Sequence, residues 1–393
     1  MKPEFVDVGS SRNLVGMTVS SQVRGGVELA CFSCGFSHDE SSLQTVCRDC
    51  GLPIRVTVPL PDGVPEDVID TSIDSMWRYG PALPVPVADS VSLGEGWTPL
   101  IDVGGGIFVK GESGNPTGSF KDRGMSMAVS VARLLGAERV VAPSAGNAAV
   151  ALSAYGAEAG LPVVVAMPDD TPSPIIENCR RLGAEVQLVD GDISVAGKWL
   201  AQNRGKDDFD VSTLKEPYRV EGKKTMGYEL FEQFGGELPD VVIYPTGGGT
   251  GLVGMWKAWG EMEQMGWIGS ERPRLVSVQS AGCAPIVKAF DEGKSDIDPW
   301  PNPVTEAWGL RVPSPIGGFL CLRAVAETAG SALAIPEDEI HSAADWASEE
   351  MGIDFCPEGG AAWAAAQRLR DRGEIAKDDR VLVWNTGSGA NYR

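Results

Sequence analysis

Apolar residues fall into short runs from about residue 98 onward, and these runs alternate with stretches in which apolar residues recur every three or four positions. A short apolar run predicts a buried strand, and the three-to-four spacing predicts an amphipathic helix. Strands are predicted at residues 107–110, 139–143, 162–167, 185–189, 241–245, 275–279 and 380–384. Helices are predicted from Lys121, over 148–160, over 175–182, through Gly197 and Leu200, over 225–234, and from Leu252. This alternation predicts an α/β protein with mostly parallel sheet covered by helices.

The region before residue 98 has a different pattern. Residues 59–93 are rich in proline and acidic residues, which predicts an extended connection. We expect the segment Trp77-Arg78-Tyr79 to anchor this connection to the main body. Ahead of it lie two Cys-x-x-Cys pairs, one formed by Cys31 and Cys34 and the other by Cys47 and Cys50.

The spacing of these two pairs is typical of a zinc ribbon, in which each pair brings two thiolates onto one turn. We predict that the four cysteines bind one structural zinc ion, because four sulfur ligands leave no coordination position open for catalysis. A redox dithiol and a ribbon that has lost its metal are the alternatives. His38, between the pairs, is predicted to be a surface residue, and the remaining cysteines are predicted to be ordinary buried thiols.

The amino-acid composition argues against some classes of binding partner. The chain has 393 residues, 43% of them hydrophobic, and its formal net charge at pH 7 is −21. An acidic surface repels nucleic acids and anionic membranes, so neither is expected as a partner. The sequence has no run of 18 uncharged apolar residues and no apolar signal segment near its first residue, so we expect a cytoplasmic protein.

Ligands of parallel α/β sheets bind at the loops that follow the strands, and three such loops have an unusual composition. The first follows strand 139–143 and consists of Ser144, Ala145, Gly146, Asn147 and Ala148. Its backbone N–H groups, its hydroxyl and its amide are suited to a carboxylate at the start of a helix. Serine and asparagine are also ordinary helix caps, so capping alone is the alternative.

The second loop follows strand 241–245 and is rich in glycine. Its residues are Thr246, Gly247, Gly248, Gly249, Thr250 and Gly251. Glycines let the backbone wrap a small anion and the helix N-terminus adds partial positive charge, which predicts a phosphate cradle. The loop lacks the signature of a P-loop and the spacing of a dinucleotide site, which favours a monophosphate. The third loop follows strand 380–384 and offers the Thr386 hydroxyl, which could bond a ring nitrogen.

Lys121 lies near a helix start in the stretch Asn115-Pro116-Thr117-Gly118-Ser119-Phe120-Lys121-Asp122-Arg123-Gly124. Ser119 is predicted to cap this helix, with Asp122 three residues on. The positive end of the helix dipole disfavours an ammonium group there, so we expect a lowered pKa for Lys121. A neutral amine is the form that attacks an aldehyde.

A reactive amine, a carboxylate loop, a monophosphate cradle and a neutral hydroxyl are together the groups that pyridoxal phosphate requires. The Lys121 stretch resembles the cofactor-lysine motif of threonine synthase, in the fold type II (tryptophan-synthase β-like) family of pyridoxal-phosphate enzymes. The resemblance extends through the Ser-x-Gly-Asn loop, the glycine-rich loop and the C-terminal Thr-Gly-Ser-Gly, and it covers residues 29–393.

The resemblance implies a role for each motif. Lys121 would form the Schiff base and move protons, Asn147 would bond the phenolic oxygen of the cofactor, and residues 144–148 would hold the substrate carboxylate. Residues Gly247, Gly248, Gly249, Thr250 and Gly251 would bind the cofactor phosphate, and Thr386 would face the pyridine nitrogen. The family reaction converts O-phospho-L-homoserine and water into L-threonine and phosphate.

This chain departs from the family pattern around the substrate. Threonine synthases commonly have Ser-Thr-Gly-Asn-Thr in the asparagine loop, where this chain has Ala145 and Ala148. The segment 389–392, Gly-Ala-Asn-Tyr, stands in place of the usual Gly-Leu-Lys. Arg180 and Arg181 are predicted to lie at the C-terminal end of their helix, where the helix dipole favours positive charge. The alternative is that one of them contacts the leaving phosphate of the substrate.

The resemblance also implies the organisation of the chain. We expect a zinc-ribbon-like segment at 1–58, a large cofactor-binding α/β domain at 59–114 and 226–393, and a smaller α/β domain at 115–225. Two open, mostly parallel sheets with helices on both faces would flank the active-site cleft. The expected activity is that of a pyridoxal-phosphate-dependent lyase acting as a homodimer on a phosphorylated amino acid. A cysteate synthase-like β-replacement on O-phosphoserine, a threonine or serine ammonia-lyase, and a catalytically idle scaffold of the same fold are the alternatives.

Overall fold

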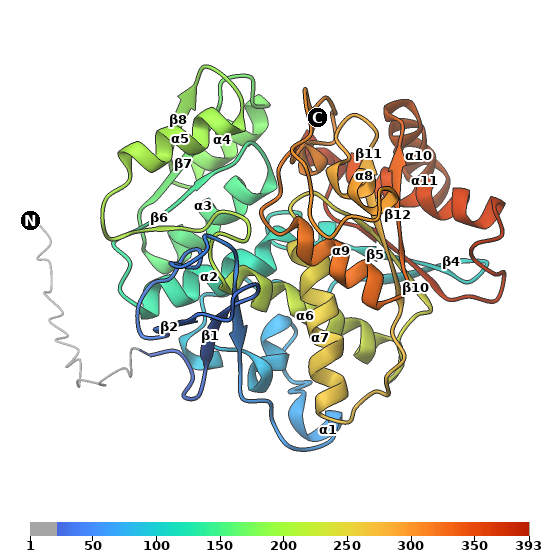
Figure 1. Cartoon of the computed structure of the whole chain (residues 1–393), viewed down its shortest axis with the longest axis horizontal. Helices are drawn as coiled ribbons and strands as arrows, with labels where there is room; N and C mark the ends of the chain where they lie inside the picture. Colours follow the sequence, from blue (N-terminus) through green and yellow to red (C-terminus); the bar gives the residue numbers. More distant parts are fainter. Residues whose placement is uncertain (1–21, 393) are drawn as a thin grey trace, which may run out of the picture.

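Residues 22–392 are described by a computed structural model, and this part of the chain contains three sheets (Figure 1). The first 21 residues of the predicted ribbon segment lie outside the described residues. The three sheets are a small antiparallel one near the N-terminus, a four-stranded one and a six-stranded one. The predicted α/β class with two mostly parallel sheets is therefore confirmed.

The antiparallel sheet contains the cysteine pairs. It has the order β2-β1-β3 and consists of β1 (Glu28–Cys31), β2 (Ser37–His38) and β3 (Ile54–Thr57). His38 is only 9% exposed, so its prediction as a surface residue was wrong. Its place in β2, opposite Leu29 of β1, turns the ring inward, which a position between two cysteine pairs does not reveal.

The four-stranded sheet is entirely parallel and has the order β8-β7-β6-β9. Its strands are β6 (Arg139–Pro143), β7 (Val163–Pro168), β8 (Glu185–Val189) and β9 (Asp208–Asp210). The helices around it are α2 (Lys121–Leu134), α3 (Asn147–Ala159), α4 (Ser173–Arg181) and α5 (Ile193–Asn203). Alternate strand residues face opposite sides, so Val140 packs in the core with α2 and α3, whereas Val141 packs with α5.

The six-stranded sheet has the order β12-β11-β10-β13-β5-β4, and only β4 is antiparallel to its neighbour. Its strands are β4 (Leu100–Gly104), β5 (Ile107–Gly111), β10 (Val241–Pro245), β11 (Arg274–Ser280), β12 (Ser331–Ile335) and β13 (Val381–Asn385). One face is covered by α6 (Tyr218–Gln233), α7 (Thr250–Gln264), α8 (Pro285–Asp291) and α9 (Gly318–Glu327). The other face is covered by α10 (Glu337–Met351) and α11 (Pro357–Asp371).

Short helical segments connect these elements. They are α1 (Pro65–Val68) and the 3₁₀ segments η1 (Met76–Ala82), η2 (Val87–Asp89), η3 (Glu112–Gly114), η4 (Trp308–Leu310) and η5 (Gly389–Tyr392). The predicted anchor in the proline-rich connection is confirmed, because Trp77, Arg78 and Tyr79 are all buried. The indole Nε1 of Trp77 donates to Glu95 at 2.8 Å and to Ser126 of α2 at 3.2 Å.

The largest error in the predicted helices concerns α6. We predicted its start at residue 225, but it begins at Tyr218. Every residue from 218 to 231 is buried, including Arg219, Glu221, Lys223 and Lys224. A hydrophobicity pattern assigns such charged residues to the surface, and it therefore could not find a helix that buries them. The pattern also gave no sign of β4, β9, β12 or helices α8 to α11.

In the part of the chain that the structure describes, no helix combines the length and the apolar character that crossing a membrane requires.

Candidate active site

The loop before Lys121 is paired with the loop after β13. Ser119 and Gly387 form an antiparallel bridge, the backbone N–H of Phe120 donates to the carbonyl of Thr386 at 3.0 Å, and that of Ser388 donates to the carbonyl of Gly118 at 2.8 Å. These backbone bonds fix the first turn of α2 against the end of the central strand of the six-stranded sheet. Lys121 and Thr386, predicted from separate motifs, therefore lie in one site.

The asparagine loop joins the same site from the four-stranded sheet. Asn147 is the first residue of α3, and a Cβ added to Gly387 would lie 3.3 Å from its Nδ2 atom. The side-chain oxygen of Asn147 accepts a hydrogen bond from Asn391 at 2.9 Å, and its Nδ2 donates to the Tyr392 hydroxyl at 3.3 Å. Among the other residues of the predicted carboxylate loop, Ser144, Ala145, Gly146 and Ala148 are half-buried, so a small ligand can reach them.

The glycine-rich loop lies between β10 and the N-terminus of α7. Gly249 precedes the first residue of the helix and has φ +84°, a conformation that favours glycine. A Cβ on Gly247 would overlap the carbonyl oxygen of Gly309, so the loop is packed too closely for side chains there. The ring of Phe120, adjacent to Lys121, lies 6.1 Å from that of Tyr244, near the end of β10, which brings the loop to the lysine. The first turn of α7 follows this loop directly, and binding of an anion by its N–H groups stays a prediction.

The start of α2 differs from the predicted capping. Phe120 occupies the cap position, and the carboxylate of Asp122 accepts bonds from the backbone and hydroxyl of Thr117 instead of reaching back to Ser119. Ser119 contributes one weak bond, from the N–H of Lys121 to its hydroxyl at 3.3 Å. The Asn-Pro-Thr-Gly turn before the helix supplies the partner of Asp122, which explains the difference.

The pKa of Lys121 is lowered to about 8, as predicted in direction. The main cause is burial, which disfavours the ammonium form, and the second is the positive charge of Arg219. The sequence argument had assigned the lowering to the helix dipole. A lysine whose pKa lies near 8 supplies a neutral amine at physiological pH far more often than an ordinary lysine does.

Two further basic side chains lie beside Lys121, and the sequence predicted neither as a site residue. Arg219 and Lys223 are one turn apart on α6 and are 2% and 0% exposed. The Nε atom of Arg219 and the Nζ atom of Lys223 have no hydrogen-bond partner. The Nζ atoms of Lys121 and Lys223 lie 4.1 and 3.9 Å from the centre of the same Phe120 ring. Burial lowers the pKa of Lys223 well below its usual value, and Lys121 adds to this effect. The spacing of four residues between two basic side chains was the available signal.

One buried carboxylate acts on the charge of Lys121. Glu358 lies in the first turn of α11 and is 3% exposed. Its Oε1 atom accepts hydrogen bonds from the backbone of Gly309 at 2.7 Å and from the Tyr392 hydroxyl at 2.8 Å. Its Oε2 atom has no hydrogen-bond partner. The charge of Glu358 raises the pKa of Lys121 against the effect of burial, so the two residues share one electrostatic environment.

A different buried cluster, which we call the Arg123 network, holds α2 in place. Arg123 pairs with Glu112 at 2.8 Å and with Glu229 of α6 at 2.6 Å, and Glu229 also pairs with Lys110 of β5 at 2.5 Å. All four side chains have 0% exposure. The network links the helix that begins with Lys121 to β5 of the six-stranded sheet and to α6.

The four cysteines of the ribbon lie together. Their sulfur atoms are all within 4.8 Å of one another, with Cys31 and Cys50 at 3.4 Å and Cys34 and Cys47 at 3.7 Å. Sulfur atoms around a tetrahedral zinc ion at a Zn–S distance of ~2.3 Å lie ~3.8 Å apart. The cluster could therefore bind zinc. The other four cysteines are buried and unpaired, as predicted.

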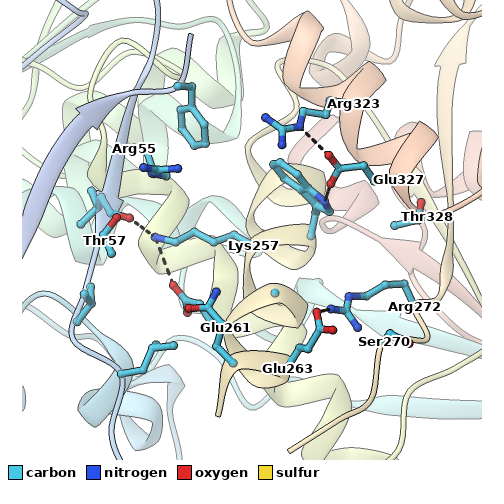
Figure 2. A pocket seen from close by; sticks show the side chains of 17 residues that line it. Arg55, Thr57, Lys257, Glu261, Glu263, Ser270, Arg272, Arg323, Glu327 and Thr328 are labelled. Carbon is cyan, nitrogen blue, oxygen red and sulfur yellow. Dashed lines mark hydrogen bonds and ion pairs between the residues drawn. The ribbon is translucent and has the colours of Figure 1, made fainter. Parts of the chain in front are cut away.

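Two hollows are of a size that could hold a substrate. The larger, of about 710 Å³, lies between β3 of the ribbon and helices α7 and α9 (Figure 2). There Lys257 extends from α7 to the carbonyl of Val56, at 2.6 Å, while Arg272 pairs with Glu263 and Arg323 pairs with Glu327. No predicted site residue lines this hollow, so it is not the active site.

The smaller hollow, of about 500 Å³, adjoins the lysine loop. Thr117, Gly118 and Asn391 line it on one side, and Arg181 lines it on the other. Arg181 is exposed and donates to Asn178 at 2.9 Å, while Arg180 is exposed and does not line the hollow. A contact between Arg181 and a substrate phosphate stays a prediction.

These residues fit pyridoxal phosphate. A lysine with a lowered pKa, an amide, a hydroxyl and a glycine-rich loop meet from four segments of the chain. Near them, three buried polar atoms lack hydrogen-bond partners, one each in Arg219, Lys223 and Glu358. Comparison with known proteins agrees with this chemistry: residues 91–387 match the family model described as pyridoxal-phosphate dependent enzyme. The chain belongs to this family.

Relatives of this pyridoxal-phosphate enzyme include archaeal threonine synthases. The enzyme is 31% identical to threonine synthase of Methanosarcina acetivorans over 369 residues and 32% identical to that of Methanocaldococcus jannaschii over 372 residues. Each alignment covers 91% of this chain and 91% of the relative.

Solved structures agree on the fold. A fungal L-serine ammonia-lyase from Rhizomucor miehei superposes with a TM-score of 0.65 at 19% identity, over 77% of this chain and 98% of that one. Maize serine racemase superposes with a TM-score of 0.63 at 22% identity, over 74% and 88% of the two chains. The enzyme therefore has the fold type II architecture that the sequence predicted.

Proposed function

We propose that this enzyme is a threonine synthase, a lyase that converts O-phospho-L-homoserine and water into L-threonine and phosphate. The observation that carries the proposal is the pair Arg219 and Lys223. Both are buried basic side chains beside Lys121, and each has a donor without a hydrogen-bond partner. A site that leaves such donors unpaired is suited to an anion, since each buried unpaired donor destabilises the protein until a ligand satisfies it.

The proposed site accommodates two phosphates. The glycine-rich loop and the N-terminus of α7 would bind the phosphate of the cofactor. Arg219 and Lys223 would bind the phosphate of the substrate, which offsets the missing hydroxyls at Ala145 and Ala148. Relatives of similar length named threonine synthase support the same substrate class.

The chain's own residues would then have distinct tasks. The N–H groups of residues 144–148 would orient the substrate carboxylate, and Asn147 and Thr386 would hold the cofactor ring. Lys121 would take the proton from the α carbon of the substrate and return it later. Bound pyridoxal phosphate supplies an electron-withdrawing ring that makes this proton acidic.

A product assay tests the proposal. Purified protein with pyridoxal phosphate is incubated with O-phospho-L-homoserine, with O-phospho-L-serine plus sulfite, and with L-threonine or L-serine alone. We expect phosphate and L-threonine from the first mixture. Lys121→Ala should lose both this activity and the visible absorbance of the Schiff base. If the wild-type protein releases no phosphate from O-phospho-L-homoserine, the proposal is wrong.

A β-replacement on O-phosphoserine is the second candidate, because the pair of cations would recognise its phosphate as well. Cysteate formation in the second mixture would favour it. Ammonia and a keto acid from L-threonine or L-serine would indicate an ammonia-lyase. A protein without Schiff-base absorbance would instead support the idle scaffold.

We also propose one structural zinc ion per chain at the four cysteines. Cys31→Ser/Cys34→Ser protein should lose zinc in metal analysis and keep the cofactor absorbance, since the cluster shares no residue with the cofactor site. Less than about half an equivalent of zinc in wild-type protein purified without chelator would indicate a ribbon that has lost its metal.

A further inference from the structure

The C-terminal segment η5 contacts the amide of Asn147 through two side chains. The Nδ2 atom of Asn391 donates to Oδ1 of Asn147 at 2.9 Å, and Nδ2 of Asn147 donates to the Tyr392 hydroxyl at 3.3 Å. This segment is also where the chain departs from the usual Gly-Leu-Lys. An amide has donors on its nitrogen and an acceptor on its oxygen, so the ligand that it can bind depends on which way it is turned. Neither Asn391 nor Tyr392 has a task in the proposed function.

The Tyr392 hydroxyl determines one side of this amide. Its single hydrogen is donated to Oε1 of Glu358 at 2.8 Å, and a carboxylate oxygen only accepts. Burial and the charge of Glu358 raise the pKa of Tyr392 well above its usual value, so the phenol keeps this hydrogen. Because its hydrogen is used, the hydroxyl can only accept from Asn147. Asn147 must therefore turn its nitrogen toward Tyr392.

Asn391 determines the other side of the amide. Its Nδ2 atom also donates to the backbone carbonyl of Thr117 at 3.3 Å, and a carbonyl only accepts. The nitrogen of Asn391 must face that carbonyl, and its two hydrogens are then used by Thr117 and Asn147. Backbone bonds hold the segment in place, from the N–H of Ser388 to Gly118 at 2.8 Å and from the N–H of Asn391 to Ser388 at 3.3 Å. Asn147 must therefore turn its oxygen toward Asn391.

The two constraints on the amide agree, although they come from opposite ends of one hydrogen-bonded chain. They leave the second hydrogen of Asn147 Nδ2 available to a ligand, and a Cβ on Gly387, the residue after Thr386, would lie 3.3 Å from this nitrogen. We propose that Asn391 and Tyr392 are positioning residues, which hold the Asn147 amide with its nitrogen available to the phenolic oxygen of the cofactor. The inference rests on the proposed cofactor site but not on a phosphorylated substrate.

Reversing the amide tests this role. In Asn391→Asp/Tyr392→Phe, which we call the reversed variant, a carboxylate that only accepts stands opposite Asn147 and the opposing hydroxyl is gone. The nitrogen of Asn147 should then turn toward the new carboxylate, which brings its oxygen to the side of the cofactor. Asn391→Leu/Tyr392→Phe, the neutral variant, is the matched comparison, because it loses the same two contacts without imposing either orientation.

Pyridoxal phosphate is titrated into cofactor-free protein, and the dissociation constant and the absorbance spectrum are measured. We expect the reversed variant to bind the cofactor at least about tenfold more weakly than wild type, because it loses a hydrogen bond to a charged oxygen. The neutral variant should bind only about twofold more weakly, because two orientations of the amide are then available instead of one. A donor to the phenolic oxygen favours its charged form, so only the reversed variant should move part of the visible absorbance into the ultraviolet.

An Asn147→Ala background separates the orientation of the amide from the effect of the added charge. Without the amide there is nothing to turn, so the two substitutions of the reversed variant should change the dissociation constant by less than about twofold in that background. Asn203→Asp adds the same charge at an exposed amide of α5 and should bind the cofactor as wild type does.

Equal binding by the reversed and neutral variants, or an equal loss in the Asn147→Ala background, would overturn the inference. If the reversed variant does not fold, Asn391→Asp and Asn391→Leu are compared in the same two backgrounds, and the same order of affinities is required. Wild type without Schiff-base absorbance would overturn the inference together with the cofactor site. The expected titrations without release of phosphate from O-phospho-L-homoserine would overturn only the proposed reaction.

Discussion

Helices α2 and α6 contact two clusters of buried charge that differ in one respect. In the Arg123 network every cation has a carboxylate within 2.8 Å, whereas Arg219 and Lys223 have donors with no hydrogen-bond partner. Both clusters are fully buried. The first is complete without a ligand, whereas in the proposed function an anion would complete the second. Pairing, and not burial or charge alone, therefore distinguishes a structural cluster from a binding site.

Breaking the Arg123 network should have the largest effect on the free energy of unfolding. Arg123→Met leaves Glu112 and Glu229 buried with less compensation, and removing one partner of a buried pair costs ~3–5 kcal/mol. We expect the free energy of unfolding in urea to fall by about this amount. An unfolding free energy within ~1 kcal/mol of wild type would mean that the network does not stabilise the fold.

Two consecutive lysines of α6 provide a matched comparison. Lys224 is paired with Glu221 at 2.8 Å and with Glu261 at 3.0 Å, while Lys223 has no carboxylate partner. Lys224→Met should lower the free energy of unfolding by ~3 kcal/mol, and Lys223→Met should leave it unchanged or raise it. Only Lys223→Met should weaken inhibition by inorganic phosphate, by about tenfold, because a hydrogen bond to a charged group contributes ~1.5–3 kcal/mol. Equal effects of the two substitutions on stability and on phosphate would contradict the comparison.

The smallest expected effect is the change in the free energy of unfolding with pH that Lys121 causes. The pKa of Lys121 is about 8 in the folded protein, below its usual 10.5. Between these values the unfolded chain binds more protons than the folded one, so the free energy of unfolding rises with pH, by at most ~1.4 kcal/mol per unit. Cofactor-free wild type should gain stability relative to cofactor-free Lys121→Met between about pH 8 and about pH 10. Parallel curves for the two proteins would show that Lys121 is not desolvated.

The sequence predicted the helices and strands whose buried residues are the apolar ones. Strands such as Val241–Pro245 are apolar throughout and fully buried, so their runs were recognisable. The first turns of α6 were not, because their buried face carries charges whose partners lie far away in sequence. Glu221, for example, pairs with Lys257 of α7, and no local pattern predicts a contact over such a separation.

The same limit applies to the site. Lys121, Asn147, Thr386 and the glycine-rich loop each belong to a local motif with its own chemistry, and the structure brings them together. Arg219, Lys223 and Glu358 have no local motif, since their significance lies in the partners that they lack. Unpaired atoms are a property of packing, and only a three-dimensional structure reveals them.

The central position of β13 has a consequence for the order of folding. The four-stranded sheet uses only residues 139–210, so it can form from a continuous piece of the growing chain. The six-stranded sheet cannot close until β13 enters between β10 and β5, which pairs Val381 with Ile107. Pairing over such a distance is slow, and the six-stranded half is expected to remain open during synthesis after the smaller half has formed. Because Thr386 follows β13 directly and is hydrogen-bonded to Phe120, the last strand to enter also completes the pocket around Lys121.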